Sequence, residues 1–345
     1  MPDSPICIDL GVFAHNEAAN ITQTLKALLA QDILADPAFD VRIFVVANAC
    51  TDQTVALARQ AAQGHAAVTV CDFPQGGKSR NMHRFIHQLA RPQAGLIGCI
   101  DADIDLPDPS TLRRMAENMH ARPDLHAFVS KPVKDVVFGQ ARAGLIGRMI
   151  AAGGGGLTDY RNAICGQLFL LRANVARGLV LPIGLPVEDG FIRAMIVTDH
   201  LSQAENLDRI DGQDDIFHVY ASIQSLPELL RHQTRLVVGS AVNTALFSMI
   251  RRDGPTPDRA RALLQPGTTD AAWLGHVLRH ELPARGYGYV PFEFLLHRVQ
   301  GGKLRAALRR GPKAALITLA GLALDAVVFL RANLRMITGR AAGHW

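Results

Sequence analysis

The sequence has few cysteines, few aromatic residues and no motif typical of a nucleic-acid-binding domain. Aromatic residues make up 6% of the chain, and neither zinc-finger spacing nor an aromatic ribonucleoprotein motif is present. We therefore expect no nucleic acid partner. No Cys-x-x-Cys pair occurs, which indicates buried, reduced thiols rather than a zinc site or a disulfide framework. The five cysteines are scattered: Cys7, Cys50, Cys71, Cys99 and Cys165.

The N-terminus also lacks the pattern of a secretory signal. The opening residues MPDSPICIDLGVF contain no basic segment followed by a long apolar run, so we expect a cytoplasmic protein. Across 345 residues, 48% are apolar and 19% are charged. This composition favours a packed catalytic domain of roughly 200 to 250 residues with an extension. The net charge of +5 is compatible with an anionic substrate or lipid surface and does not choose between them.

Short apolar runs alternate with segments of helical spacing in the first hundred residues. This alternation predicts an α/β fold with a mostly parallel central sheet flanked by helices. We expect strands over residues 6–13, 41–46, 68–71 and 96–100, and helices over residues 20–30, 54–63 and 79–90.

Each of these four strands is followed by a polar sequence. Ligands of parallel α/β sheets bind beyond the carboxyl ends of the strands, so we expect the four polar sequences to converge on one crevice. They cover residues 15–17, 48–52, 75–78 and 101–105.

The second half of the chain has a different pattern. The run Gly153–Gly156 lacks the residues of a P-loop or dinucleotide fingerprint and predicts a loop over the site. From about Leu226 the pattern is largely helical, and Gly254-Pro255-Thr256-Pro257 interrupts it. We expect two parts, a catalytic domain over residues 1–250 and a helical C-terminal extension over residues 251–345.

Several segments together resemble the inverting family 2 glycosyltransferases, which have the fold called GT-A. The resemblance covers roughly residues 6 to 240 and depends on the order of the segments, since each alone is weak. They are Phe13-Ala14-His15-Asn16-Glu17, Asn48-Ala49-Cys50-Thr51-Asp52, Gly76-Gly77-Lys78-Ser79-Arg80, Asp101-Ala102-Asp103, Gly166-Gln167, Val187-Glu188-Asp189-Gly190 and Gln233-Thr234-Arg235-Leu236.

The resemblance implies a nucleotide-sugar donor, a UDP-sugar or GDP-sugar, bound with Mg²⁺ or Mn²⁺. Asp103 would ligate the metal, and Asp101 would face the ribose or a metal-bound water. Such a cation neutralises the charge that develops on the leaving diphosphate, and carboxylates at a strand end suit it. The alternative is a solvated acidic turn before Pro107.

Four further residues are candidates for donor binding. Glu17 could accept a hydrogen bond from the ribose or base, and Asn16 either binds the donor or ties the turn together. Asn48 stands where the family usually has an acidic residue that reads the base, so a preference for uracil does not follow. Lys78 is the preferred cation for the diphosphate or base, with Arg80 as the other candidate; surface charge is the alternative for both.

The resemblance assigns the general base to Asp189, which would remove the proton of the acceptor hydroxyl. Glu188 would contact the acceptor or orient the base. The alternative is an acidic pair at the start of a helix. Gln233 and Arg235 would flank the site, but the family motif Gln-x-x-Arg-Trp has its arginine one position later and its tryptophan is absent here. His218 is a candidate further metal ligand, although a lone strand histidine is more often structural.

Residues Ala314–Leu330 form an apolar run between basic residues, interrupted by Thr318 and Asp325. The run is short for a membrane span, and Asp325 would be costly in lipid. The pattern favours an interfacial helix with peripheral membrane contact, and a helix buried against the catalytic domain or in a dimer is the alternative. The basic flanks are Lys303, Arg305, Arg309, Arg310, Lys313, Arg331 and Arg335.

Two other functions are compatible with parts of the sequence. A sugar-phosphate nucleotidyltransferase would need a glycine-rich basic loop after the first strand, and none follows Val12. A degenerate sugar-nucleotide-binding or membrane-docking module would not need Asp103 and Asp189. The acceptor cannot be read from residues 136–165, and a lipid-linked acceptor is one candidate.

Overall fold

The computed structural model describes residues 4–139, 160–282, 286, 288–296, 309 and 311–339. The predicted loop at Gly153–Gly156 and the flanking cations Lys303, Arg305 and Arg310 lie outside these residues.

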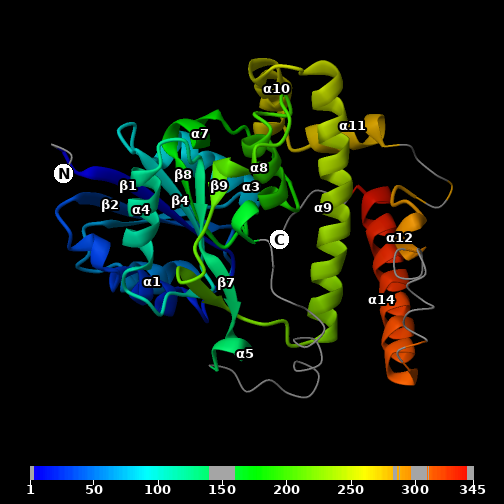
Figure 1. Cartoon of the computed structure of the whole chain (residues 1–345), viewed down its shortest axis with the longest axis horizontal. Coiled ribbons are helices and arrows are strands. Elements are labelled where there is room, and N and C mark those ends of the chain that lie inside the picture. The colour runs from blue at the N-terminus through cyan, green and yellow to red at the C-terminus, as the bar shows by residue number, and fades with distance from the viewer. Residues whose placement is uncertain are drawn as a thin grey trace.

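A seven-stranded sheet forms the centre of the molecule, with the order β3-β2-β1-β4-β8-β6-β9 (Figure 1). The first four strands in this order are parallel, as predicted from the alternating apolar runs. They are β1 (Ile6–Ala14), β2 (Phe39–Asn48), β3 (Val68–Phe73) and β4 (Leu96–Asp101).

Three predicted helices connect these strands. The third continues as a π-helix, so its backbone pattern changes within the single helix that the sequence predicts. The helices are α1 (Ile21–Leu29), α2 (Thr54–Ala61) and α3 (Lys78–Arg84), with the π-helix over Phe85–Leu89.

The other half of the sheet contains a reversed strand. β8 (Leu168–Arg172) pairs antiparallel with both β4 and β6 (Ala127–Val129), and β9 (Ile210–Asp211) is parallel to β6. The amino end of β8 therefore lies beside the carboxyl end of β4. There the amide of Asp101 donates a hydrogen bond to the carbonyl of Gln167 at 2.8 Å.

A second, three-stranded sheet extends from this edge. Its order is β5-β10-β7, with β5 (Ile104–Asp105), β10 (Phe217–Tyr220) and β7 (Lys131–Lys134). It places β10 next to the chain that follows Asp101. The intervening helices are α4 (Thr111–Ala121), α5 (Asp135–Phe138), α7 (Ala173–Gly178) and α8 (Glu188–Val197), and 3₁₀ turns cover Asp32–Leu34, Tyr160–Asn162 and Leu207–Arg209.

Side chains on both faces of the sheet are buried in hydrophobic cores. Ile8 and Leu10 of β1 pack on one face with residues of α1 and α4. The other face contacts α3, α8 and α9, and Phe85 lies against Gly11. A Cβ atom at Gly11 would be 2.6 Å from the Phe85 ring, so this close approach requires glycine.

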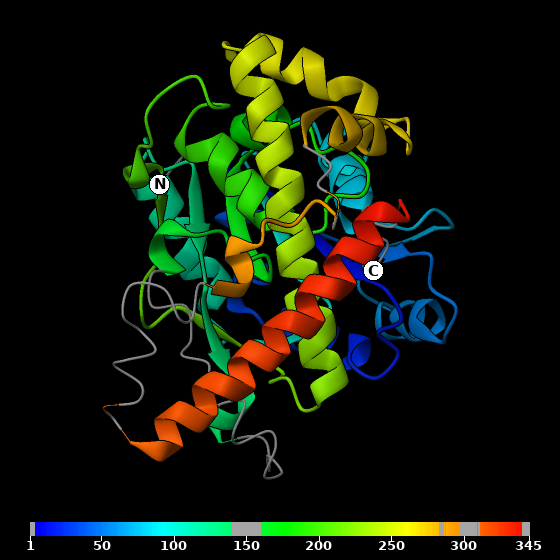
Figure 2. The ribbon, with the colours of Figure 1, turned by 90° about the vertical axis from the view of Figure 1, so that its right-hand side faces the viewer.

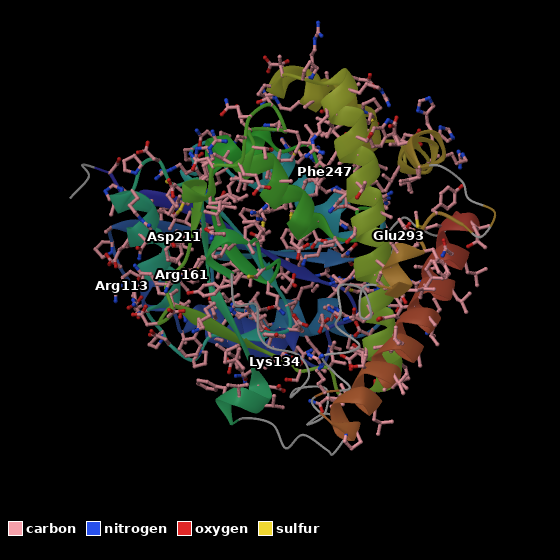
Figure 3. The ribbon with its side chains drawn as sticks, turned by 45° about the vertical axis from the view of Figure 1, so that its right-hand side comes forward. Arg113, Lys134, Arg161, Asp211, Phe247 and Glu293 are labelled. Atoms are coloured by element: carbon pink, nitrogen blue, oxygen red, sulfur yellow. The ribbon has the colours of Figure 1, made fainter. Side chains whose placement is uncertain are left out.

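The C-terminal part is helical, as predicted, and lies at one side of the sheet (Figure 1). The helix α9 begins after Ser225, whose hydroxyl caps it by accepting from the amide of Glu228 at 3.3 Å. Its Phe247, labelled in Figure 3, stacks on Phe191 of α8 with ring centroids 6.0 Å apart. The helices are α9 (Leu226–Asp253), α10 (Pro257–Leu264), α11 (Trp273–Glu281), α12 (Glu293–Leu296) and α14 (Pro312–Ile337), with a 3₁₀ turn at Gln265–Thr268.

Helix α14 crosses α9 obliquely (Figure 2) and has two unlike faces. Asp325 is 5% exposed and lies on the buried face with Val328 and Ala332. The opposite face carries exposed apolar side chains. The buried position of Asp325 agrees with a helix packed against the domain, and membrane contact stays a prediction. Over Leu316–Ile337 it is long and apolar enough to cross a membrane by length and composition, which for one helix is weak evidence.

Candidate functional site

Two of the predicted polar sequences, residues 15–17 and 48–52, meet where β1 and β2 end. Asn16, with a left-handed φ of 56°, accepts a hydrogen bond from the amide of Thr51 at 2.8 Å through Oδ1. The amide of Glu17 donates to Thr54 Oγ1 at 2.7 Å. Asn16 therefore ties the two strand ends together. Glu17 is half-buried, and burial raises the pKa of its carboxyl group.

Asn48 is placed differently from the base-reading role predicted for it. Its side chain is 0% exposed, and Oδ1 accepts from Asn81 Nδ2 at 2.6 Å. Asn81 in turn accepts from Arg84 at 3.1 Å, and that guanidinium lies over the Phe73 ring at 4.2 Å. Burial thus removes Asn48 from contact with a base, and it holds the start of α3 instead.

Lys78 is buried at the start of α3, where it meets three acceptors. Its Nζ lies 2.5 Å from Asp101 Oδ1, 3.1 Å from Glu188 Oε1 and 3.1 Å from the carbonyl of Gly166. Burial alone would lower the pKa of Lys78, but the charges of Asp101 and Glu188 outweigh it and raise that pKa. Lys78 therefore remains an ammonium that joins three segments.

The two aspartates after β4 differ in exposure. Asp103 is exposed, whereas Asp101 is largely buried with 22% of its side chain accessible. Burial raises the pKa of Asp101 to about 7, although the Lys78 ammonium opposes the shift. The negative charge of Asp103 contributes to the raised pKa of both Asp101 and Glu17.

Glu188 and Asp189 form the first turn of α8, where acidic side chains are favoured by the helix dipole. Glu188 is 5% exposed and ion-paired with Lys78. Burial raises the pKa of Asp189, and the charge of Glu188 adds to the shift. Asp189 is therefore a stronger base than an ordinary aspartate.

His218 is not placed as a metal ligand. It is fully buried, with Nδ1 3.0 Å from Ser130 Oγ and Nε2 3.0 Å from Gln167 Oε1. Burial lowers the pKa of His218 to about 3, so the ring is neutral. Both ring nitrogens are engaged, and the structural alternative for this residue is the correct one.

Arg235 and Gln233 lie on α9 in the first half of the helix. Arg235 is exposed, and its charge lowers the pKa of Asp189 against the other influences. Gln233 is half-buried and makes no side-chain hydrogen bond to the residues that the structure describes. Arg235 thus acts on the site at long range, while the side chain of Gln233 has no hydrogen-bond partner among the described residues.

The carboxylates present suit a hard divalent cation. Within the described ranges, no group of three or more His, Cys, Asp or Glu side chains is arranged to hold a metal. Mg²⁺ bound to nucleotides commonly uses one or two carboxylates, with water and phosphate oxygens completing its shell. The exposed Asp103 beside Asp101 supplies that smaller donor set.

Residues 9–174 match the sequence model of the family described as glycosyl transferase family 2. The chain carries a family 2 glycosyltransferase domain. The family 2 match includes Glu17, Lys78, Asp101 and Asp103, and it ends before Asp189. No curated protein matches the sequence.

Solved structures share the fold of this family 2 domain. A mannosyltransferase from Pyrobaculum calidifontis, in complex with GDP-Man and Mn²⁺, has a TM-score of 0.56 at 16% identity. The alignment covers 98% of this chain and 89% of that one. A glucosyl-3-phosphoglycerate synthase from Mycobacterium tuberculosis, in complex with Mn²⁺, UDP-glucose and phosphoglyceric acid, has a TM-score of 0.46 at 17% identity, covering 71% and 79%. The mannosyltransferase confirms the predicted GT-A fold.

The sequence analysis missed Asn81 and named Gly166 only as part of the Gly166-Gln167 segment. Asn81 holds Asn48, and the carbonyl of Gly166 accepts from Lys78. Gly166 has a φ of +68°, and a Cβ atom there would lie 3.2 Å from Asp189 Oδ2. Neither has a chemical signature, although Asn81 follows the Gly-Gly-Lys-Ser-Arg segment directly.

Proposed function

We propose that this protein transfers a sugar from a nucleotide-diphospho-sugar to an acceptor hydroxyl with inversion, with the help of a divalent metal. The observation that carries the proposal is the position of Lys78, which contacts Asp101 and Glu188 together. Lys78 thereby holds Asp101, at the proposed donor site, next to Glu188, at the proposed acceptor site.

On the donor side, Asp103 and Asp101 would hold Mg²⁺ or Mn²⁺. The metal, when bound, supplies neutralisation of the charge that develops on the leaving diphosphate. Arg80 is half-buried and forms no ion pair with a described residue, so it is the better candidate for phosphate contact now that Lys78 is engaged. Glu17 remains a candidate for the ribose or base.

On the acceptor side, Asp189 acts as the general base. The acceptor oxygen forms a bond to the anomeric carbon while the bond from that carbon to the diphosphate breaks on the opposite face. The hydroxyl proton passes to Asp189, and the configuration at the anomeric carbon is inverted. Glu188 orients the base through α8, and Gln233 and Arg235 flank this side of the site.

The donor base is a uracil or a guanine in this proposal. Asn48 is buried and uncharged, so the acidic uracil contact common in the family is absent at that position. The mannosyltransferase of similar fold was solved with GDP-Man. We therefore place UDP- and GDP-sugars first among donors of hexoses.

The test is transfer or hydrolysis across a panel of UDP- and GDP-sugars with Mn²⁺. Wild-type activity is expected with at least one donor, and Asp103→Ala and Asp189→Asn are each expected to reduce kcat by about 100-fold or more. Asp124→Ala replaces an exposed aspartate outside the site and should retain full activity. Unchanged activity in both site variants would refute the mechanism.

We assign residues 1–250 to the catalytic domain and residues 251–345 to a helical extension. The stacking of Phe247 on Phe191 ties α9 to α8 and hence to the catalytic part. Gly254 follows α9 directly and ends it.

We further propose that the extension places this cytoplasmic protein on the inner face of a membrane, where an acceptor carried by a lipid is accessible. One face of α14 carries an apolar stripe whose members are 43% to 67% exposed: Leu316, Leu319, Val327, Leu330, Leu334 and Ile337. Their spacing of three, four, seven or eight residues puts them on one side of a helix.

An anionic bilayer suits this stripe better than water does. Arg331 and Arg335 lie in the last turns of α14 and can contact anionic headgroups. Asp325 faces the protein, so the cost of a carboxylate in lipid does not arise for a helix that lies on the surface. The stripe would enter the interface while the inner face keeps its contact with α9.

Vesicle flotation tests this docking independently of activity. Full-length protein is expected to float with vesicles of phosphatidylglycerol and phosphatidylcholine, and less so at high salt. The double variant Leu316→Ser/Leu330→Ser should lose flotation, whereas Leu207→Ser, at an exposed leucine elsewhere, should not. Absence of flotation, or a dimer in solution that the double variant abolishes, would overturn the proposal.

A further inference from the structure

We infer that Lys78 is a positioning residue that fixes Glu188, and with it the base Asp189, relative to the strand end that carries Asp101. The inference rests on the proposed function for the role of Asp189. It replaces the expectation that Lys78 contacts the donor diphosphate or base.

Three oxygen atoms surround Nζ of Lys78, as many as its ammonium group has hydrogens. An ammonium has three hydrogens and no acceptor, and three acceptors lie within 3.1 Å of Nζ: Asp101 Oδ1, Glu188 Oε1 and the carbonyl of Gly166. The lysine is 9% exposed. The Gly166 contact is a hydrogen bond and the two carboxylate contacts are ion pairs, so a phosphate oxygen at Nζ would compete with partners that already lie within 3.1 Å.

The three acceptors come from separate segments of the chain. Asp101 ends β4, Gly166 precedes β8, and Glu188 begins α8, while Lys78 begins α3. A single buried cation therefore crosslinks four elements at the catalytic edge. Removal of one partner from such a group leaves an uncompensated buried charge, which is strongly unfavourable.

The link to the base runs through Glu188. Asp189 is the next residue in the same helical turn, so a displaced Glu188 also displaces Asp189. The charged groups that act on Asp189 are Glu188, Lys78 and Arg235, and Asp189 in turn acts on the thiol of Cys165. Glu188 raises the pKa of Asp189, whereas Lys78 and Arg235 lower it.

Hydrogen exchange of the full-length protein tests the positioning role without requiring activity. In Lys78→Met and in Glu188→Gln, amides in the first turn of α8 are expected to exchange at least about tenfold faster. A tenfold change corresponds to ~1.4 kcal/mol of lost local stability. The double variant Lys78→Met/Glu188→Met should exchange less than the sum of the two effects predicts, because the pair acts as a unit.

A second buried ion pair provides the matched control. Asp9 is 0% exposed and pairs with Arg91 at 2.8 Å, at the opposite end of β1 from the site. Asp9→Asn should lower Tm but leave exchange at the start of α8 at the wild-type rate. If Lys78→Met weakens binding of Mn²⁺ and nucleoside diphosphate while exchange in α8 is unchanged, Lys78 is a donor ligand and the inference is wrong.

If Glu188 had a purely structural role, Glu188→Gln would leave the pH profile of kcat in place. Loss of the Glu188 charge should lower the pKa of Asp189, so the acidic limb of kcat should move to lower pH, with donor KM within about twofold of wild type. An unmoved limb contradicts the inference. If the wild type transfers no sugar, the proposed function fails, and the exchange result still decides the role of Lys78.

Discussion

His218 and Gln167 are joined by a 3.0 Å contact between Nε2 and Oε1, 51 residues apart in sequence. The backbone carbonyl of Gln167 also accepts from the amide of Asp101 at 2.8 Å. A neutral histidine buried on β10 therefore supports the strand end from which Asp101 and Asp103 project. Its role is mechanical, because both ring nitrogens already have protein partners.

Replacement of His218 by phenylalanine is expected to destabilise the fold. Ser130 and Gln167 would lose a partner in a buried place, which costs about 1–3 kcal/mol each, so the free energy of unfolding and Tm should both fall. Binding of Mn²⁺ with a nucleoside diphosphate, measured by calorimetry below the new Tm, should persist. Loss of that binding at unchanged stability would instead identify His218 as a ligand.

The same histidine makes stability depend on pH. Its folded pKa of about 3 lies below the unfolded value of about 6.5, so the unfolded chain binds the proton first. The contribution is present above pH 6.5 and the free energy of unfolding decreases as pH falls towards 3. Urea titrations at several pH values should show a flatter dependence in His218→Phe. An equally steep dependence in the variant would contradict this assignment.

Gly166→Ala should reduce kcat between about 10- and 100-fold. The new Cβ atom would crowd Asp189 Oδ2 at 3.2 Å, and the left-handed φ of +68° adds strain of about 1–2 kcal/mol. Gly64→Ala is the control, because Gly64 has a φ of +80° with nothing within 4 Å of the added atom. If the two variants lose Tm to a similar extent but only Gly166→Ala loses kcat, the loss is due to crowding of Asp189 and not to backbone strain. Similar kcat values in the two variants would contradict the prediction.

The pH dependence of the wild type follows from Asp189. Its pKa is raised, chiefly by burial, and the base must be ionised to accept a proton. Activity should therefore fall on acidification at a pH above the ordinary aspartate range near 3.9. Profiles of kcat between pH 3 and 9 measure this limb. A limb at or below pH 3.9 would show that another group is the base.

Asn48→Ala is expected to lower stability without changing base preference. The variant removes the 2.6 Å bond from Asn81 inside the core, at a cost of about 1–3 kcal/mol. Asn81→Ala should have a similar effect, and the double variant should cost less than the sum. Calorimetry with UDP and GDP checks the second part. A changed ratio of the two affinities would restore Asn48 as a base-reading residue.

The order of strands and helices up to Asp101 was predictable because local patterns determine it. Apolar runs and helical spacing reflect burial on both faces of a parallel sheet. The helix over 79–90 was predicted as uniform, yet it changes to a π-helix at Phe85. No pattern in the sequence reveals that change.

Residues 130–200 show how long-range contacts escape sequence reasoning. Strand β7 is half-buried at the edge of the three-stranded sheet, and β8 is mostly buried inside the seven-stranded sheet. Both pair with strands that lie far along the chain. Antiparallel insertion of β8 between β4 and β6 has no local signal.

The residues that belong to the candidate site could be predicted from the sequence better than their individual roles could. Lys78 joins Asp101 to Glu188, and Asp103 follows Asp101 by two residues at the same strand end. The engagement of Lys78 and the burial of Asn48 depend on partners in other elements. Exposure cannot be read from residue type alone for polar side chains that find a partner inside the protein.

The reversed direction of β8 has a consequence for how this site tolerates change. Because β8 runs against β4, it is the first residue of the strand, and not the last, that stands at the catalytic edge. The chain entering β8 can therefore lengthen or shorten upstream of Gly166 while the strand register fixes Gln167 against Asp101. Under the proposed function, acceptor preference is free to change on that side while Asp101 keeps its position.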